Sequence, residues 1–186
     1  MVSIFNPFQK IAGTRALNMG IVITFLTLLI SFYSHSVFNG VIDFHVFPFS
    51  TIWPYAFYYV IAWLCLVIYF GLAGLIFTKT RFRWIDIAGT TLLSRFPLLL
   101  IAIAAFAIPY IDTAALSNLS KIHFTAGFYI ASTFSLLCII WTIALYYNSY
   151  RICLNIKGQK AIWSFIAVMI MAEATSLFII HCIHLK

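Results

Sequence analysis

Apolar residues form five long runs that together cover most of the chain. A helix that crosses the roughly 30 Å hydrocarbon core of a bilayer needs about 20 mostly apolar residues. Runs of that length predict membrane-spanning helices over residues 17–36, 52–77, 87–110, 126–150 and 161–183. We therefore predict an all-α fold, an integral membrane bundle of five transmembrane helices that occupies residues 1–186 as a single domain. Pro97 lies inside the third run and should bend that helix, because proline removes a backbone donor.

Basic residues are concentrated in alternate connections between these runs. Short cytoplasmic loops of membrane proteins carry an excess of lysine and arginine, so the basic connections are predicted to be cytoplasmic. The other connections hold only Lys121 and Lys186. The N-terminus is therefore expected in the cytoplasm and the C-terminus outside. The basic set comprises Lys10, Arg15, Lys79, Arg81, Arg83, Arg151, Lys157 and Lys160.

Composition argues against an appended soluble domain. Hydrophobic residues make up 64% of the chain and charged residues 8%, whereas soluble domains carry about 25% charged residues. The net charge of +7 is explained by loops that lie beside anionic lipid, so we expect the lipid bilayer as a partner and no nucleic acid. The expected location is a bacterial cytoplasmic (inner) membrane. Residues 1–16 could form an interfacial helix, since Phe5, Phe8 and Ile11 share one helical face, or an ordinary leader.

Two charged residues lie within the apolar runs, Arg95 in the third and Glu173 in the fifth. A charge near the middle of a bilayer costs roughly 2.5–3.5 kcal/mol, so two opposite charges are expected to form an ion pair. Both helices start at the cytoplasmic side, and the two residues lie about 12 and 18 Å along them at 1.5 Å per residue. The pair could fix helix register or belong to a proton or ion pathway. We favour the structural role, because a pathway usually needs further polar groups or broken helices.

Histidine and aspartate residues gather at the predicted outer face. Imidazole and carboxylate groups can bind zinc, copper or nickel. No two of these residues have the His-x-x-x-His spacing of a known helical site, so interfacial histidines that contact headgroups and water are the favoured interpretation. The candidate metal ligands are His35, Asp43, His45, His123, His181 and His184.

Several short stretches resemble the Yip1 family of small five-span membrane proteins, in a short bacterial form. Eukaryotic members of that family carry a long cytosolic tail and an Asp-Leu-Tyr-Gly-Pro signature, which this chain lacks. The resemblance therefore implies the fold and the membrane location but not a role in vesicle traffic. The stretches are Ala73-Gly74-Leu75-Ile76, Asp86-Ile87-Ala88-Gly89-Thr90, Leu93-Ser94-Arg95-Phe96-Pro97-Leu98 and Gly158-Gln159-Lys160-Ala161.

The sequence lacks the motifs of common enzymes, including Gly-x-Ser-x-Gly, His-Glu-x-x-His and the P-loop. We therefore predict a non-enzymatic protein without a catalytic residue or a bound cofactor. Its expected role is membrane organisation or contact with lipid, with other membrane proteins or with a second copy of itself. One alternative is a small transporter or permease that uses Arg95 and Glu173. A second alternative is a metal-dependent function of the outer-face histidines and Asp43.

Overall fold

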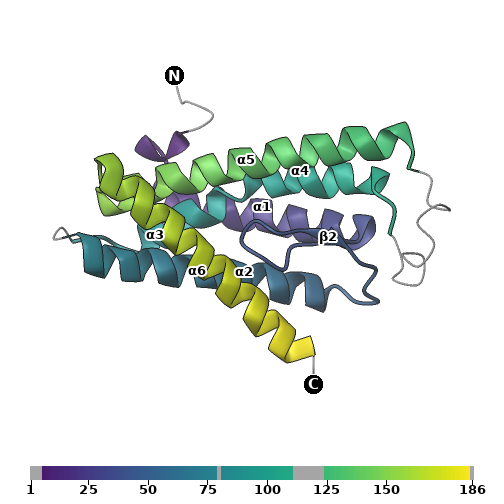
Figure 1. Cartoon of the computed structure of the whole chain (residues 1–186), viewed down its shortest axis with the longest axis horizontal. Coiled ribbons are helices and arrows are strands. Elements are labelled where there is room, and N and C mark those ends of the chain that lie inside the picture. Colours follow the sequence, from purple (N-terminus) through teal and green to yellow (C-terminus); the bar gives the residue numbers. More distant parts are fainter. Residues whose placement is uncertain (1–5, 79–80, 111–123, 185–186) are drawn as a thin grey trace.

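A computed structural model describes residues 6–78, 81–110 and 124–184 of the chain (Figure 1). Within these described residues, five helical segments are long and apolar enough to cross a membrane, which supports the predicted all-α bundle and a multi-pass membrane protein. The third segment consists of two α-helices and a 3-10 turn. The helices are α1 (Gly13–Ser34), α2 (Trp53–Phe77), α3 (Trp84–Leu93), α4 (Phe96–Ala104), α5 (Ala126–Leu154) and α6 (Gly158–His184), with 3-10 turns η1 (Pro7–Gln9) and η2 (Ala105–Ala107) and strands β1 (Ser36–Val37) and β2 (His45–Val46).

Small residues allow α1 and α3 to pack closely. An added Cβ at Gly89 would lie 2.6 Å from the carbonyl oxygen of Gly13 and 2.8 Å from the amide nitrogen of Leu17. Both atoms belong to the backbone of the neighbouring segment, which cannot move aside as a side chain can. Small residues at such crossings let helix backbones approach within a membrane, where no hydrophobic force drives helices together. The contact fixes α3 against the start of α1.

The third span is broken at Ser94 and Arg95, where α3 ends and α4 begins. Pro97 occupies the first turn of α4 and has no N–H to donate. In a continuous helix its ring would also clash with the carbonyl of Leu93. The predicted bend at Pro97 is therefore confirmed as a break. The hydroxyl of Ser94 donates to the carbonyl of Thr90 at 2.7 Å, which satisfies one of the carbonyls near the break.

The connection between α1 and α2 folds back into the bundle as a hairpin (Figure 1). Strands β1 and β2 pair in antiparallel fashion, with Val37 opposite His45. Phe38 and Val41, which lie between the strands, are 2% and 0% exposed. Irregular backbone at membrane depth is tolerated only where protein surrounds it or where it lines a cavity. We call residues 36–46 the inserted hairpin.

The hydroxyl of Tyr55, on the first turn of α2, holds the chain that follows the inserted hairpin. It donates to the carbonyl of Phe47 at 3.0 Å and accepts the N–H of Phe49 at 3.1 Å. The Tyr55 side chain is 1% exposed, so these bonds form away from solvent. These two bonds fix the segment after the inserted hairpin to the first turn of α2.

The described part of the N-terminal segment does not form the interfacial helix considered for residues 1–16. It forms the η1 turn, and α1 begins at Gly13. Phe8 is 2% exposed and packs with Ala16, Leu93 and Leu145. Pro7 and the left-handed backbone of Gly13 interrupt a continuous helix here. Phe8 therefore contributes to the bundle core instead of facing lipid.

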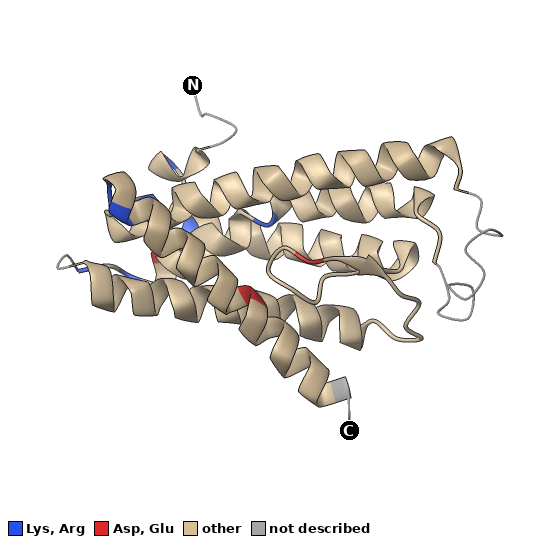
Figure 2. Ribbon diagram, in the orientation of Figure 1, with Lys and Arg blue, Asp and Glu red and all other residues tan. Residues whose placement is uncertain are grey.

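Most of the described lysine and arginine residues lie at one end of the bundle (Figure 2). We call this the basic end. Arg95 is the exception, because it is fully buried within the bundle. The inserted hairpin enters from the opposite end. The described residues of the basic end are Lys10, Arg15, Arg81, Arg83, Arg151, Lys157 and Lys160.

Candidate functional site

Arg95 lies at the break in the third span, is 0% exposed and contacts Tyr59 of α2. Its Nη1 donates to the backbone carbonyl of Tyr59 at 3.2 Å. The guanidinium carbon lies 3.9 Å from the centroid of the Tyr59 ring, which is a cation–π contact. Among the described residues, Nε and Nη2 of Arg95 and the hydroxyl of Tyr59 have no hydrogen-bond partner.

Glu173 binds the tip of the inserted hairpin. Its Oε2 accepts the N–H of Val41 at 2.6 Å and the N–H of Ile42 at 3.1 Å. The carboxylate also lies directly against Gly40, where a side chain would collide with it. Hydrogen bonds to an ionised acceptor are about twice as strong as neutral ones. Glu173 therefore acts as a clamp that joins α6 to the hairpin.

Arg95 and Glu173 do not form the direct ion pair that we predicted. Within the part of the chain that the structure describes, one ion pair is formed, between Arg83 and Asp86 at 3.9 Å. Arg95 contacts Tyr59 instead, and Glu173 contacts backbone N–H groups of the hairpin. The physical reason is the inserted hairpin, whose unpaired amides use the carboxylate.

Tyr146 lies in the same region of the bundle as the two charged residues. Its side chain is 0% exposed, and its hydroxyl donates to the carbonyl of Val41 at 3.4 Å. Arg95, Tyr59 and Glu173 all lie within electrostatic range of it. We use the name polar centre for Tyr59, Arg95, Tyr146 and Glu173. The predicted charges thus share one region without direct contact.

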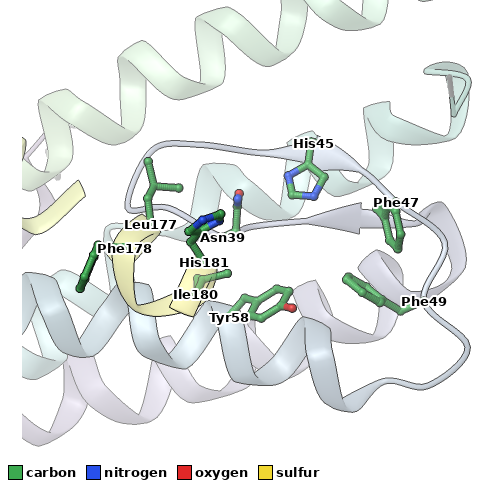
Figure 3. A pocket seen from close by; sticks show the side chains of 9 residues that line it. All are labelled: Asn39, His45, Phe47, Phe49, Tyr58, Leu177, Phe178, Ile180 and His181. Atoms are coloured by element: carbon green, nitrogen blue, oxygen red, sulfur yellow. The ribbon is translucent and has the colours of Figure 1, made fainter. Parts of the chain in front are cut away.

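A groove of about 670 Å³ lies between the inserted hairpin, α2 and α6 (Figure 3). We call it the hairpin groove. Its walls are mostly apolar and aromatic, and three polar side chains, Asn39, His45 and His181, also line it. The Oδ1 atom of Asn39 is buried without a hydrogen-bond partner among the described residues. The apolar wall consists of Phe47, Phe49, Tyr58, Leu177, Phe178 and Ile180.

The predicted metal ligands are dispersed. His45 and His181 share the hairpin groove, whereas Nδ1 of His35, at the end of α1, lies 3.5 Å from the Tyr55 hydroxyl. Asp43 is exposed on the hairpin. His123 lies outside the described residues, as does the side chain of His184. Within the described part of the chain, no three such side chains come together as a metal site. The metal hypothesis stays a prediction.

Sequence reasoning did not identify Tyr59, Tyr146 or the hairpin as parts of the site. The tyrosines lie in apolar runs, where they are indistinguishable from core or interfacial aromatics. The hairpin did have a signal, because Asn39-Gly40 is a dipeptide typical of hairpin connections. That signal indicates a turn, but it does not indicate that the turn is buried.

Comparisons with protein-family models, curated proteins and solved structures found no match to this chain. The resemblance to the Yip1 family therefore stays a prediction. Functional interpretation depends on the geometry of the polar centre and the hairpin groove.

Proposed function

We propose that this protein is a non-enzymatic membrane component that binds an amphipathic lipid in the hairpin groove. The supporting observation is the composition of the groove, which combines aromatic and aliphatic walls with Asn39, His45 and His181. Its volume of about 670 Å³ lies in the range of small-molecule sites, roughly 300–1,000 Å³. Apolar walls accept an acyl chain, and a few polar side chains fix the orientation of a headgroup.

The position of the groove also favours a ligand from the bilayer. Phe178, on the α6 wall, is 68% exposed, so this side of the groove opens on the surface that lipid covers. His45 and His181 are exposed as well. Both histidines lie toward the end opposite the basic end, where imidazole groups can contact headgroup oxygens. A membrane lipid could thus enter sideways without leaving the bilayer.

The inserted hairpin makes the groove a preformed site. Its tip is held by the Glu173 clamp, and its returning strand is followed by the segment that Tyr55 binds. A wall fixed at both ends loses little conformational entropy when a ligand binds. This arrangement gives Glu173 a structural role in lipid binding, through the hairpin and not through the ion pair with Arg95 that the sequence predicted.

Native mass spectrometry of the full chain, released from lipid nanodiscs, tests this proposal. Leu177→Trp should block the groove and remove the retained lipid. Leu137→Trp is the matched control, because Leu137 is 60% exposed on α5 and lies outside the groove. Wild type and L137W are expected to retain lipid adducts that L177W loses. Equal retention by all three proteins would contradict the proposal.

A small transporter that uses Arg95 and Glu173 is the second candidate function. The break of the third span at Arg95 favours it, because discontinuous helices often surround transporter binding sites. Proteoliposomes that hold wild type or Glu173→Gln distinguish this candidate from lipid binding. A proton flux that E173Q abolishes in a folded protein would support transport, and the absence of any flux would count against it.

A further inference from the structure

The guanidinium of Arg95 is a buried positive charge without a carboxylate in contact. The side chain is fully buried, and its direct contacts are one hydrogen bond and one ring contact with Tyr59. Tyr146 and Glu173 lie within electrostatic range of its charge without touching it. The carboxylate of Glu173 is already used by two backbone N–H groups. An uncompensated buried charge is strongly unfavourable, so the charge requires a partner.

We propose that Arg95 binds a small monovalent inorganic anion, such as chloride, inside the bundle. The direct donors would be Nε and Nη2, which have no hydrogen-bond partner among the described residues. The hydroxyl of Tyr59, also buried and unpaired among those residues, can donate a further bond. A guanidinium has donors in a fixed fork and no acceptor, so it selects an anion.

The start of α4, next to the backbone of Arg95, favours the same sign of charge. Arg95 is the residue that precedes the first turn of this helix, which spans Phe96–Ala104. The N-terminal end of a helix carries partial positive charge and favours anions. A cation is therefore excluded by the side chain and by the helix end together. A water molecule would satisfy N–H groups but would leave the positive charge uncompensated.

Glu173 is the alternative counter-ion, and the structure disfavours it. Both N–H groups of the hairpin are held by Oε2, and a rotation that brings this oxygen to Arg95 would break those bonds. Val41 is 0% exposed, so its N–H would lose its partner in a place where water cannot replace it. An external anion compensates Arg95 while the clamp on the hairpin stays formed. This inference is independent of lipid binding in the hairpin groove.

Thermal unfolding of the detergent-solubilised full chain provides the first test. Sodium chloride is exchanged for sodium gluconate at constant ionic strength, and tryptophan fluorescence reports unfolding. A ligand that binds only the folded state raises Tm with concentration, by roughly 3–6 °C for each tenfold increase above Kd in a chain of this size. Wild type should show this rise with chloride. Equal Tm values in chloride and gluconate would overturn the proposal.

Two arginine variants locate the effect. Arg95→Gln should lose the chloride-dependent rise, whereas Arg151→Gln should keep it, because Arg151 is exposed at the basic end. A rise retained by R95Q would overturn the proposal. If R95Q does not fold, equilibrium dialysis of wild type with radioactive chloride decides the question directly. About one chloride per chain supports the site, and no bound chloride refutes it.

Discussion

Removal of the Glu173 carboxylate should release the inserted hairpin. Glu173→Ala leaves the N–H groups of Val41 and Ile42 without their acceptor. An unsatisfied buried donor costs about 1–3 kcal/mol. Val41 is fully buried, so the cost for its N–H lies in the upper part of that range. Ile42 is only partly buried, so the cost for its N–H lies in the lower part. The expected loss is about 3–5 kcal/mol of unfolding free energy.

Glu173→Gln should cost less than Glu173→Ala. The amide keeps one carbonyl oxygen as acceptor but loses the charge, and charge-assisted bonds are about twice as strong as neutral ones. A loss of roughly 1–2 kcal/mol is therefore expected for E173Q. Asp43→Ala is the matched control, because Asp43 is an exposed carboxylate on the same hairpin. It should change the unfolding free energy by less than about 0.5 kcal/mol.

Two measurements check this series. Unfolding in mixed micelles with increasing sodium dodecyl sulfate gives the order of stability. Wild type and D43A should be the most stable, E173Q less stable and E173A the least stable. Hydrogen exchange over residues 36–46 reports the hairpin itself and should accelerate in E173A. An E173A protein that unfolds at the wild-type midpoint, with unchanged exchange in the hairpin, would refute the clamp.

Two further substitutions test how the bundle holds the hairpin and the third span. Tyr55→Phe removes the hydroxyl that bonds to Phe47 and Phe49. It should lower the unfolding free energy by about 1–3 kcal/mol and accelerate hydrogen exchange in that segment. Unchanged exchange would contradict the role given to Tyr55. Gly89→Ala should destabilise the bundle by at least about 1–3 kcal/mol, because its Cβ would meet the backbone of Gly13 and Leu17. Gly127→Ala is the control, since its nearest neighbour is 3.7 Å away, and it should be neutral or stabilising. Equal effects of the two alanines in the same unfolding assay would contradict the close α1–α3 contact.

The helices and the break were predictable because their signals are local. Apolar runs of about 20 residues determine where spans lie, and Pro97 determines where the third span can no longer continue. The partners of Arg95 and Glu173 were not predictable in the same way. Their helices are apolar on almost all sides, so the sequence pattern does not indicate how each helix is rotated in the bundle.

The burial of the inserted hairpin could not be predicted from the local sequence pattern. Residues 36–46 are too short for a span, and their apolar residues are equally consistent with an outer loop at the membrane surface. The buried tip of the hairpin, at Val41, is bound by the carboxylate of Glu173, which is more than a hundred residues away in the sequence. Sequence reasoning identified that carboxylate as significant because it is a charge in a span, but it assigned the wrong partner.

Photo-crosslinking with a phospholipid that carries a diazirine on its acyl chain tests lipid binding in the hairpin groove most directly. The protein is labelled in nanodiscs, and the modified residues are mapped by mass spectrometry. Saturable labelling that unlabelled lipid competes away is predicted at the groove residues Tyr58, Leu177 and Phe178. Labelling confined to the lipid-facing residues of α5, such as Leu136 and Leu137, without competition, would contradict the proposal.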